Sequence, residues 1–222
     1  MAARALTSPR KRASQERSRA TVDALVEATA RILVRDGFDR ASTNRIAQEA
    51  GVSIGSLYQY FPGKEALVVA VIERHNREIM QVARAAVVEA EGLPLEVAAR
   101  GIIAAAIEAH RVDPRLHRVL AEQTPRTGAL ESVEAFNSEA FRLFRAYLER
   151  HRDELRHVDL DLAAFVCVTS IEALTHTAVL HRPEVLSDEA VGTLVDEATR
   201  LVVGYLRPSA PVTTPTSVAL IR

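Results

Sequence analysis

One stretch of the chain has the spacing of a serine nucleophile. Gly51, Ser53 and Gly55 form a literal G-x-S-x-G pattern, which in an α/β-hydrolase places the serine on a turn between a strand and a helix, with acidic and histidine partners later in the chain. Here the preceding residues have helical periodicity and no credible parallel strand follows. Ser53 is better suited to capping a helix. The sequence therefore does not predict an enzyme, and it also lacks the G-x-G-x-x-G, P-loop and H-E-x-x-H motifs.

Seven histidines raise the question of a metal site. They are scattered along the chain, although Glu172 and His176 are four residues apart and should share one face of a helix. A metal would need further ligands, which the sequence does not identify. We therefore expect a helix-surface or pocket-lining pair, with no metal site and no cofactor.

Residues 43–61 predict a short helix, a glycine turn and a second short helix. Ser42 can cap the first helix and Ser53 the second. Gly51 lies just past the first helix, where glycine adopts the left-handed conformation that reverses the chain. Small or hydrogen-bonding side chains surround the bare backbone of Gly55 on the outer side of the second helix. This arrangement suits the DNA major groove, which is about 12 Å wide and admits an α-helix.

The side chains of this motif divide into an apolar set and a polar set. The apolar set is expected to form core: Ile46, Ala47, Val52, Leu57 and Phe61. The polar set cannot all be buried, because each member would need a hydrogen-bond partner: Ser56, Tyr58, Gln59 and Tyr60. Gln59 can make a bidentate pair with adenine or can point to solvent, and Ile54 can contact a thymine methyl group or simply pack.

The order of residues over this region resembles the DNA-binding signature of the tetracycline-repressor (TetR) family of bacterial transcription regulators. The matching residues are Thr43, Ile46, Ala47, Ala50, Gly51, Val52, Ser53, Gly55, Ser56, Leu57, Tyr58, Tyr60, Phe61, Lys64 and Glu65. The resemblance covers about the first third of the chain. It implies that Ser53 to Tyr60 form the recognition helix.

The resemblance also implies individual DNA contacts. Tyr58 and Tyr60 would contact phosphate or base edges, Thr43 would hold a phosphate, and Lys64 would meet the DNA backbone. Arg45 is expected to add a phosphate contact. The full set of expected DNA-binding residues is Thr43, Arg45, Ser53, Ile54, Gly55, Ser56, Tyr58, Gln59, Tyr60 and Lys64.

Composition and charge fit a DNA-binding module joined to a larger body. The chain has 222 residues, of which 48% are hydrophobic and 26% charged. Residues 1–64 hold 11 Lys or Arg against 6 Asp or Glu, whereas the remainder holds 17 against 23. A basic end supplies affinity for phosphate. Cys167 has no partner cysteine, and the sequence has neither a secretory signal nor an uncharged run of about 18 residues, so we expect a cytoplasmic protein without membrane contact.

Apolar spacing predicts an all-α fold with about nine helices. We expect a disordered basic arm over 1–13, a helix-turn-helix domain over 14–62, an effector-binding and dimerisation domain over 63–206 and a disordered tail over 207–222. The helices outside the motif are expected at 14–36, 64–90, 95–110, from 113 to a stop before Pro125, from there to 155, 159–181 and from 187 to 206.

The last two predicted helices carry more apolar surface than one small domain can cover. Residues 159–181 are apolar around much of the helix, and residues 187–206 carry a regular apolar seam. We therefore expect a homodimer, and in the resembled family these helices form a four-helix bundle with their copies. The expected interface residues are Leu162, Val166, Leu174, Val191, Leu194, Val195, Ala198, Leu201, Val202 and Tyr205.

The resemblance also implies a cavity for a small, often apolar effector within the body. The candidate lining residues are His75, His110, His117, Phe136, Phe144, Phe165, Cys167, Thr169, Glu172 and His176, which could equally be ordinary core. The function expected is a homodimeric repressor released from a pseudo-palindromic operator in double-stranded DNA by an unknown small molecule. The alternatives are an activator or ligand-independent regulator of the same fold, and a helical enzyme or small-molecule carrier.

Overall fold

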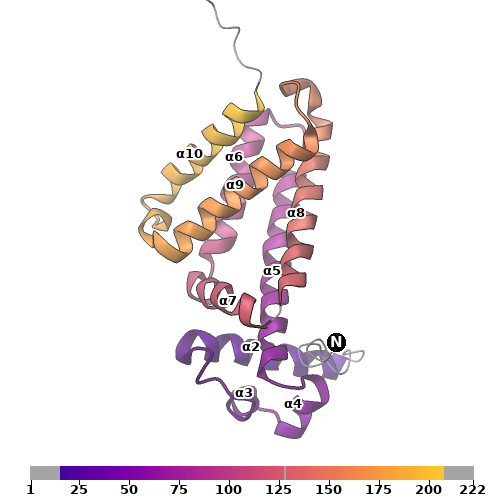
Figure 1. Cartoon of the computed structure of the whole chain (residues 1–222), viewed down its shortest axis with the longest axis vertical. Helices are drawn as coiled ribbons and strands as arrows, with labels where there is room; N and C mark the ends of the chain where they lie inside the picture. Colours follow the sequence, from indigo (N-terminus) through magenta and orange to yellow (C-terminus); the bar gives the residue numbers. More distant parts are fainter. Residues whose placement is uncertain (1–15, 128, 208–222) are drawn as a thin grey trace, which may run out of the picture.

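The computed structural model describes residues 16–127 and 129–207. Within those ranges it contains nine α-helices, two short 3₁₀ helices and no β-strand, which confirms the all-α fold class (Figure 1). The elements in chain order are α2 (Glu16–Asp36), α3 (Thr43–Glu49), α4 (Ile54–Tyr60), α5 (Lys64–Glu89), α6 (Leu95–Arg111), α7 (Pro114–Thr127), α8 (Leu130–Arg150), η1 (Arg152–Glu154), α9 (Leu160–His181), η2 (Pro183–Leu186) and α10 (Val191–Leu206).

Several helix boundaries differ from those predicted. The helix expected to stop before Pro125 includes this proline and runs to Thr127. The next helix ends at Arg150 instead of about residue 155, and η1 follows it. The last helix starts at Val191, because residues 187–190 form a turn after η2. The predicted arm over 1–13 and the tail beyond Arg207 lie outside the described residues.

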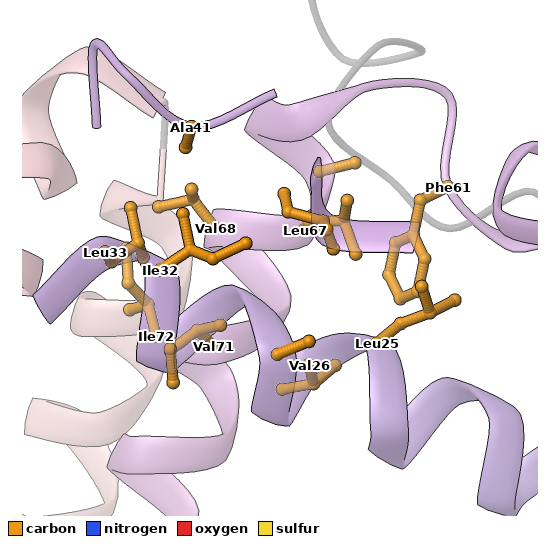
Figure 2. Close-up of a cluster of buried hydrophobic side chains, with 14 of the residues drawn as sticks. Leu25, Val26, Ile32, Leu33, Ala41, Phe61, Leu67, Val68, Val71 and Ile72 are labelled. Carbon is orange, nitrogen blue, oxygen red and sulfur yellow. The ribbon is translucent and has the colours of Figure 1, made fainter. Parts of the chain in front are cut away.

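The N-terminal unit consists of α2, α3, α4 and the first turns of α5 around one apolar core. Figure 2 shows α2 side chains such as Leu25 and Ile32 beside Leu67, Val68 and Phe61. Leu25, Ile32 and Leu67 are fully buried, and each such side chain contributes about 1.5–3 kcal/mol on burial. Because its core continues into α5, the unit is anchored firmly on that long helix.

The body is built from α5, α6, α8, α9 and α10 around a second core. In Figure 1, α5 rises from the N-terminal unit along α8, and α9 and α10 cover one side of the body. The second core includes Val87 of α5, Ile107 of α6, Leu148 of α8, Ala163 of α9 and Val202 of α10. The two cores are thus joined by the single continuous helix α5.

Helix α7 lies where the body meets the N-terminal unit (Figure 1). Its Leu116 and Leu120 are buried and belong to the core of the N-terminal unit, while the Arg118 guanidinium donates a hydrogen bond to the Val179 carbonyl on α9 at 2.8 Å. A change in the position of α7 would therefore alter its contacts with both the N-terminal unit and the body.

Helix α9 is long and apolar enough to cross a membrane by length and composition alone. Core helices of soluble proteins pass the same test, and α9 carries Asp161 and Glu172. Ala163, Ala164 and Cys167 on one side are buried in the body. Its apolar character is accounted for by packing on that side and by an exposed apolar surface on the other.

Candidate nucleic-acid interface and internal cavity

The turn between α3 and α4 has the geometry that the sequence predicts. The Ser42 hydroxyl accepts a hydrogen bond from the backbone N–H of Arg45 at 3.4 Å, and the Ser53 hydroxyl accepts one from the N–H of Ser56 at 3.1 Å. Gly51 has φ +67°, the left-handed region that other residues rarely adopt. Both caps and the glycine turn are confirmed. The hydroxyl of Ser53 serves the helix, as expected of a cap.

The outer face of α4 is exposed and polar. Tyr58 is 43% exposed, and its hydroxyl lies 3.1 Å from the Thr43 hydroxyl on α3. Ile54 is 38% exposed, and Gln59 and Gly55 are exposed as well. Residues from the two helices thus form one surface, which we call the α4 face: Thr43, Ile54, Gly55, Ser56, Tyr58 and Gln59.

The inner side of α4 is fixed by packing and by one unexpected hydrogen bond. Leu57 is fully buried, as predicted. Tyr60, expected to point outward, is only 7% exposed, and its hydroxyl donates to the Ser18 hydroxyl on α2 at 3.0 Å. The expectation that Tyr60 is outward is wrong, because a partner on α2 satisfies the phenol and lets the ring join the core.

Two cations expected at the DNA backbone have partners within the chain. The Lys64 ammonium donates to the carbonyls of Phe38 at 3.0 Å and Ala41 at 3.3 Å, and it lies 4.1 Å from the centroid of the Phe38 ring. Arg45 forms a salt bridge with Asp36 at 2.6 Å and donates to the Arg40 carbonyl at 2.9 Å. Lys64 therefore ties α5 to the loop after α2, and its contact with the DNA backbone stays a prediction. Arg45 braces α3 against the end of α2.

Further ion pairs fix α3 on α2. Glu49 accepts hydrogen bonds from Arg31 at 3.2 Å and Arg35 at 3.3 Å. The hydrogen bonds from Arg31 and then Arg35 lower the pKa of Glu49. These groups are at the surface, so their contribution to stability is small. Their effect is to set the orientation of α3, on which α4 depends.

Two adjoining cavities lie inside the body. The first is bordered by α5, α6, α8 and α9 and is almost wholly apolar, with Ile79, Ile103 and Phe144 among its walls. The second lies nearer α7 and carries four histidines and Glu172. Nine of the ten expected lining residues border one or both cavities: His75, His110, His117, Phe136, Phe144, Cys167, Thr169, Glu172 and His176. The tenth, Phe165, is 53% exposed on the outer side of α9, so its assignment to the cavity is wrong.

The four histidines expected as cavity lining meet in one cluster in the second cavity. His75 comes from α5, His110 from α6, His117 from α7 and His176 from α9. His75 Nε2 lies 2.9 Å from His117 Nδ1, and His110 Nδ1 lies 2.8 Å from the Ala106 carbonyl oxygen. Burial lowers the pKa of all four, that of His110 to about 4 and that of His117 to about 2. All four rings are therefore neutral at physiological pH.

The residues predicted to form the dimer interface differ in exposure, and the interface itself stays a prediction. Leu162, Leu174 and Leu201 are 55%, 38% and 50% exposed, and Phe165 of α9 is exposed as well. Val166, Val191, Leu194 and Tyr205 are half-buried. Three further residues assigned to the interface are buried inside the protomer: Val195, Ala198 and Val202. These three are corrected to core, because one face of α10 is needed to close the body.

Comparison with known proteins finds one family match in each of two parts of the chain. The family described as "Bacterial regulatory proteins, tetR family" matches residues 25–71. The family described as "Tetracyclin repressor-like, C-terminal domain" matches residues 94–206, about half of the chain. The first match lies within the N-terminal unit and includes the α4 face, and the second covers α6 to α10.

Individual relatives match over shorter stretches. The nucleoid occlusion factor SlmA of Haemophilus ducreyi is 34% identical over 84 residues, which are 38% of this chain and 41% of that protein. The HTH-type transcriptional repressor DrrR1 of Streptomyces coeruleorubidus is 39% identical over 57 residues, 26% of this chain and 21% of that protein. The chain therefore aligns with less than half the length of these curated relatives.

Solved structures resemble the chain over most of its length. The fatty acid degradation regulator FadR from Bacillus halodurans superimposes with a TM-score of 0.65 at 17% identity, over 82% of this chain and 94% of that one. A complex of triclosan with SmeT, the repressor of the Stenotrophomonas maltophilia multidrug efflux pump SmeDEF, has a TM-score of 0.63 at 22% identity, over 90% and 99% of the two chains. At these identities the likeness concerns the fold alone.

Proposed function

Because the chain belongs to the TetR family of bacterial transcription regulators, we propose that it is a homodimeric repressor with no enzymatic activity. The dimer acts in the cytoplasm, binds a pseudo-palindromic operator and leaves it when a small molecule occupies the body. The observation that carries this proposal is the exposed α4 face, which is held on capped helices and braced by ion pairs to α2. The proposed function has three steps, which are DNA binding, dimerisation and release, and a structural feature supports each of them.

The first step is binding of α4 in the major groove. Tyr58 is exposed and braced by Thr43, so its ring is presented outward at little cost in conformational entropy. Among residues 16–127 and 129–207, a Cβ atom added to Gly55 would meet only the Ser53 hydroxyl, at 3.8 Å, so packing within this part of the chain does not require glycine there. The bare backbone leaves room for a close external surface. Gln59 is the exposed side chain suited to a bidentate contact with adenine.

The second step is dimerisation through α9 and α10. Phe165, Leu162 and Leu201 are at least half exposed, so α9 and α10 both present large apolar side chains that a partner could cover. A second copy related by a two-fold axis would cover this surface. Such a dimer would hold two α4 helices for successive half-sites, about one helical turn or more apart.

The third step is release by an effector in the apolar cavity. Helix α5 carries Val68 and Val71 in the core of the N-terminal unit and Ile79 and Met80 in the cavity wall. A ligand that binds better when α5 is displaced would shift the spacing of the two α4 helices. Coupling of about 1–3 kcal/mol would lower operator affinity roughly 5- to 150-fold.

Selection of DNA fragments with the purified protein tests the proposal. We expect recovered fragments to share an inverted repeat, and Tyr58→Ala to weaken binding to it while leaving the dimer and its melting temperature unchanged. Val88→Ala, at a residue 69% exposed at the far end of α5, serves as the matched control. Recovery of unrelated fragments, or equal operator affinity of the Tyr58→Ala protein and the control, would refute the assignment of α4.

A further inference from the structure

We propose that His110, His117 and His176 bind one divalent ion of a late first-row transition metal, such as Zn²⁺, Co²⁺ or Ni²⁺. The three residues come from α6, α7 and α9 and meet at the wall of the second cavity. They are separated by up to 66 positions in sequence, so only the fold reveals the set. This site goes beyond the proposed repressor function and does not depend on it.

The geometry of the three rings matches a metal-binding set. The ring centroid of His117 lies 4.8 Å from the ring centroid of His110 and 4.6 Å from that of His176. The ring centroids of His110 and His176 are 5.6 Å apart. One ring nitrogen from each residue lies within 4.8 Å of the other two. Metal–nitrogen bonds of about 2.0–2.1 Å in a tetrahedral arrangement require nitrogens about 3.4 Å apart. Side-chain rotations that shift each nitrogen by about 1 Å would close the set.

The hydrogen bonds around the cluster leave Nε2 of His110 and Nε2 of His117 available as ligands. His110 Nδ1–H donates to the Ala106 carbonyl, so Nε2 keeps its lone pair. His117 Nδ1 is paired with His75 Nε2, and His117 Nε2 is buried without a hydrogen-bond partner among the described residues. Metal-bound histidines usually donate their second ring N–H to a carbonyl or another acceptor in this way. An orphaned buried nitrogen costs free energy, and a metal ion would satisfy it.

Neutral rings allow a metal to bind, and the type of ligand decides which metals fit. Metal ligation requires neutral imidazole, and burial lowers the pKa of each of the three rings. An all-nitrogen set favours zinc, nickel, copper or cobalt over magnesium or calcium. Glu172, one turn before His176, lines the same cavity and would offset part of the positive charge. The fourth coordination position would face the cavity and take water or a donor atom of a small molecule.

The position of His117 gives the site a consequence for DNA binding, if the proposed function holds. His117 lies on α7 between Leu116 and Leu120. Both leucines pack in the core of the N-terminal unit. A metal that draws His117 toward His110 and His176 would move α7 relative to that core. Occupancy would therefore change the orientation of α2 and, through it, of the α4 face.

Cobalt titration of the full chain, stripped of metal with a chelator, tests the site. We expect one Co²⁺ per protomer, with the visible absorption of low-coordinate cobalt and its loss when Zn²⁺ is added. His176→Asn alters the most open of the three ligands and should weaken Co²⁺ binding at least about tenfold. His157→Asn, at an exposed histidine outside the cluster, is the matched control and should bind like the original chain. Circular dichroism of both variants checks that they fold.

Two results would overturn the metal site. One is the absence of cobalt absorption at millimolar Co²⁺, and the other is equal Co²⁺ affinity of the His176→Asn and His157→Asn proteins. A gel shift on a selected operator tests the consequence for DNA separately, with and without Zn²⁺ at a concentration that fills the site of His157→Asn but not the weakened site of His176→Asn. We expect a change in affinity for the His157→Asn protein and none for His176→Asn. Equal affinities with and without zinc would overturn the consequence for DNA binding. Failure to bind any operator would refute the proposed function and leave the cobalt result standing.

Discussion

Replacement of Lys64 by methionine tests the role that the fold gives this residue. The ammonium joins the start of α5 to the loop after α2, through hydrogen bonds to the carbonyls of Phe38 and Ala41 and a contact over the Phe38 ring. Methionine keeps an unbranched stem of similar length and removes the charge and the donors. The expected loss is therefore confined to these three interactions.

The magnitude follows from their number and type. Each hydrogen bond contributes about 1 kcal/mol net, because water replaces the lost donor at a partly buried site. The contact with the ring adds about 0.5–1 kcal/mol. Lys64→Met should thus lower the free energy of unfolding by about 2–3 kcal/mol. For a chain of this size that corresponds to a fall of roughly 4–12 °C in melting temperature.

Urea denaturation and calorimetry measure the effect, with Arg40→Met as the matched control. Arg40 lies in the same loop and its side chain is exposed, so its replacement should change stability by less than about 0.5 kcal/mol. If Lys64 instead contacted a phosphate, its removal would shallow the slope of log affinity against log salt by about 0.9. We expect an unchanged slope. Equal stability of the two variants, together with a shallower slope for Lys64→Met, would refute the structural role.

Three further predictions concern other parts of the molecule. Leu201→Glu should convert the dimer to monomers in sedimentation velocity, whereas Val112→Glu, at a residue 80% exposed outside α9 and α10, should not; a dimeric Leu201→Glu protein would exclude α10 from the interface. Gly51→Ala should destabilise the chain by about 1 kcal/mol in urea, because φ is +67°. The added Cβ would meet no described residue within 4 Å, so the loss would come from the backbone alone, and a neutral result would contradict this argument. Because burial lowers the pKa of His110 to about 4 and of His117 to about 2, from 6.5, the unfolded chain takes up these protons first as pH falls. In chelator, the free energy of unfolding should therefore drop by about 2 kcal/mol per histidine between about pH 7 and pH 5, and a flat profile would count against neutral, buried rings.

Local signals in the sequence were sufficient for the DNA-binding motif. The caps at Ser42 and Ser53 and the turn at Gly51 are confirmed, because each depends on residues within a few positions of itself. The all-α fold class is confirmed for the same reason, since helical periodicity is also a local property. Tyr60 is the residue of the motif whose predicted exposure was wrong. Its polarity indicated exposure, but its partner Ser18 is 42 positions away.

In α10, local sequence signals likewise do not separate core residues from interface residues. A regular apolar seam shows that the helix is covered, but it does not show whether the cover is the same chain or a second copy. Val195, Ala198 and Val202 close the body, whereas Leu201 remains exposed. Only the angle at which α10 packs on α6 and α9 assigns each residue to one side or the other.

By itself, the sequence determined the elements whose stability is settled by neighbouring residues: the helices, their caps, the glycine turn and the basic N-terminal end. The tertiary structure alone decided which distant side chains meet. It paired Lys64 with the loop after α2, turned Tyr60 inward, placed Phe165 outside the cavity, and brought His110, His117 and His176 together. The physical reason is that contacts between helices depend on packing angles and register, which local propensity leaves undetermined.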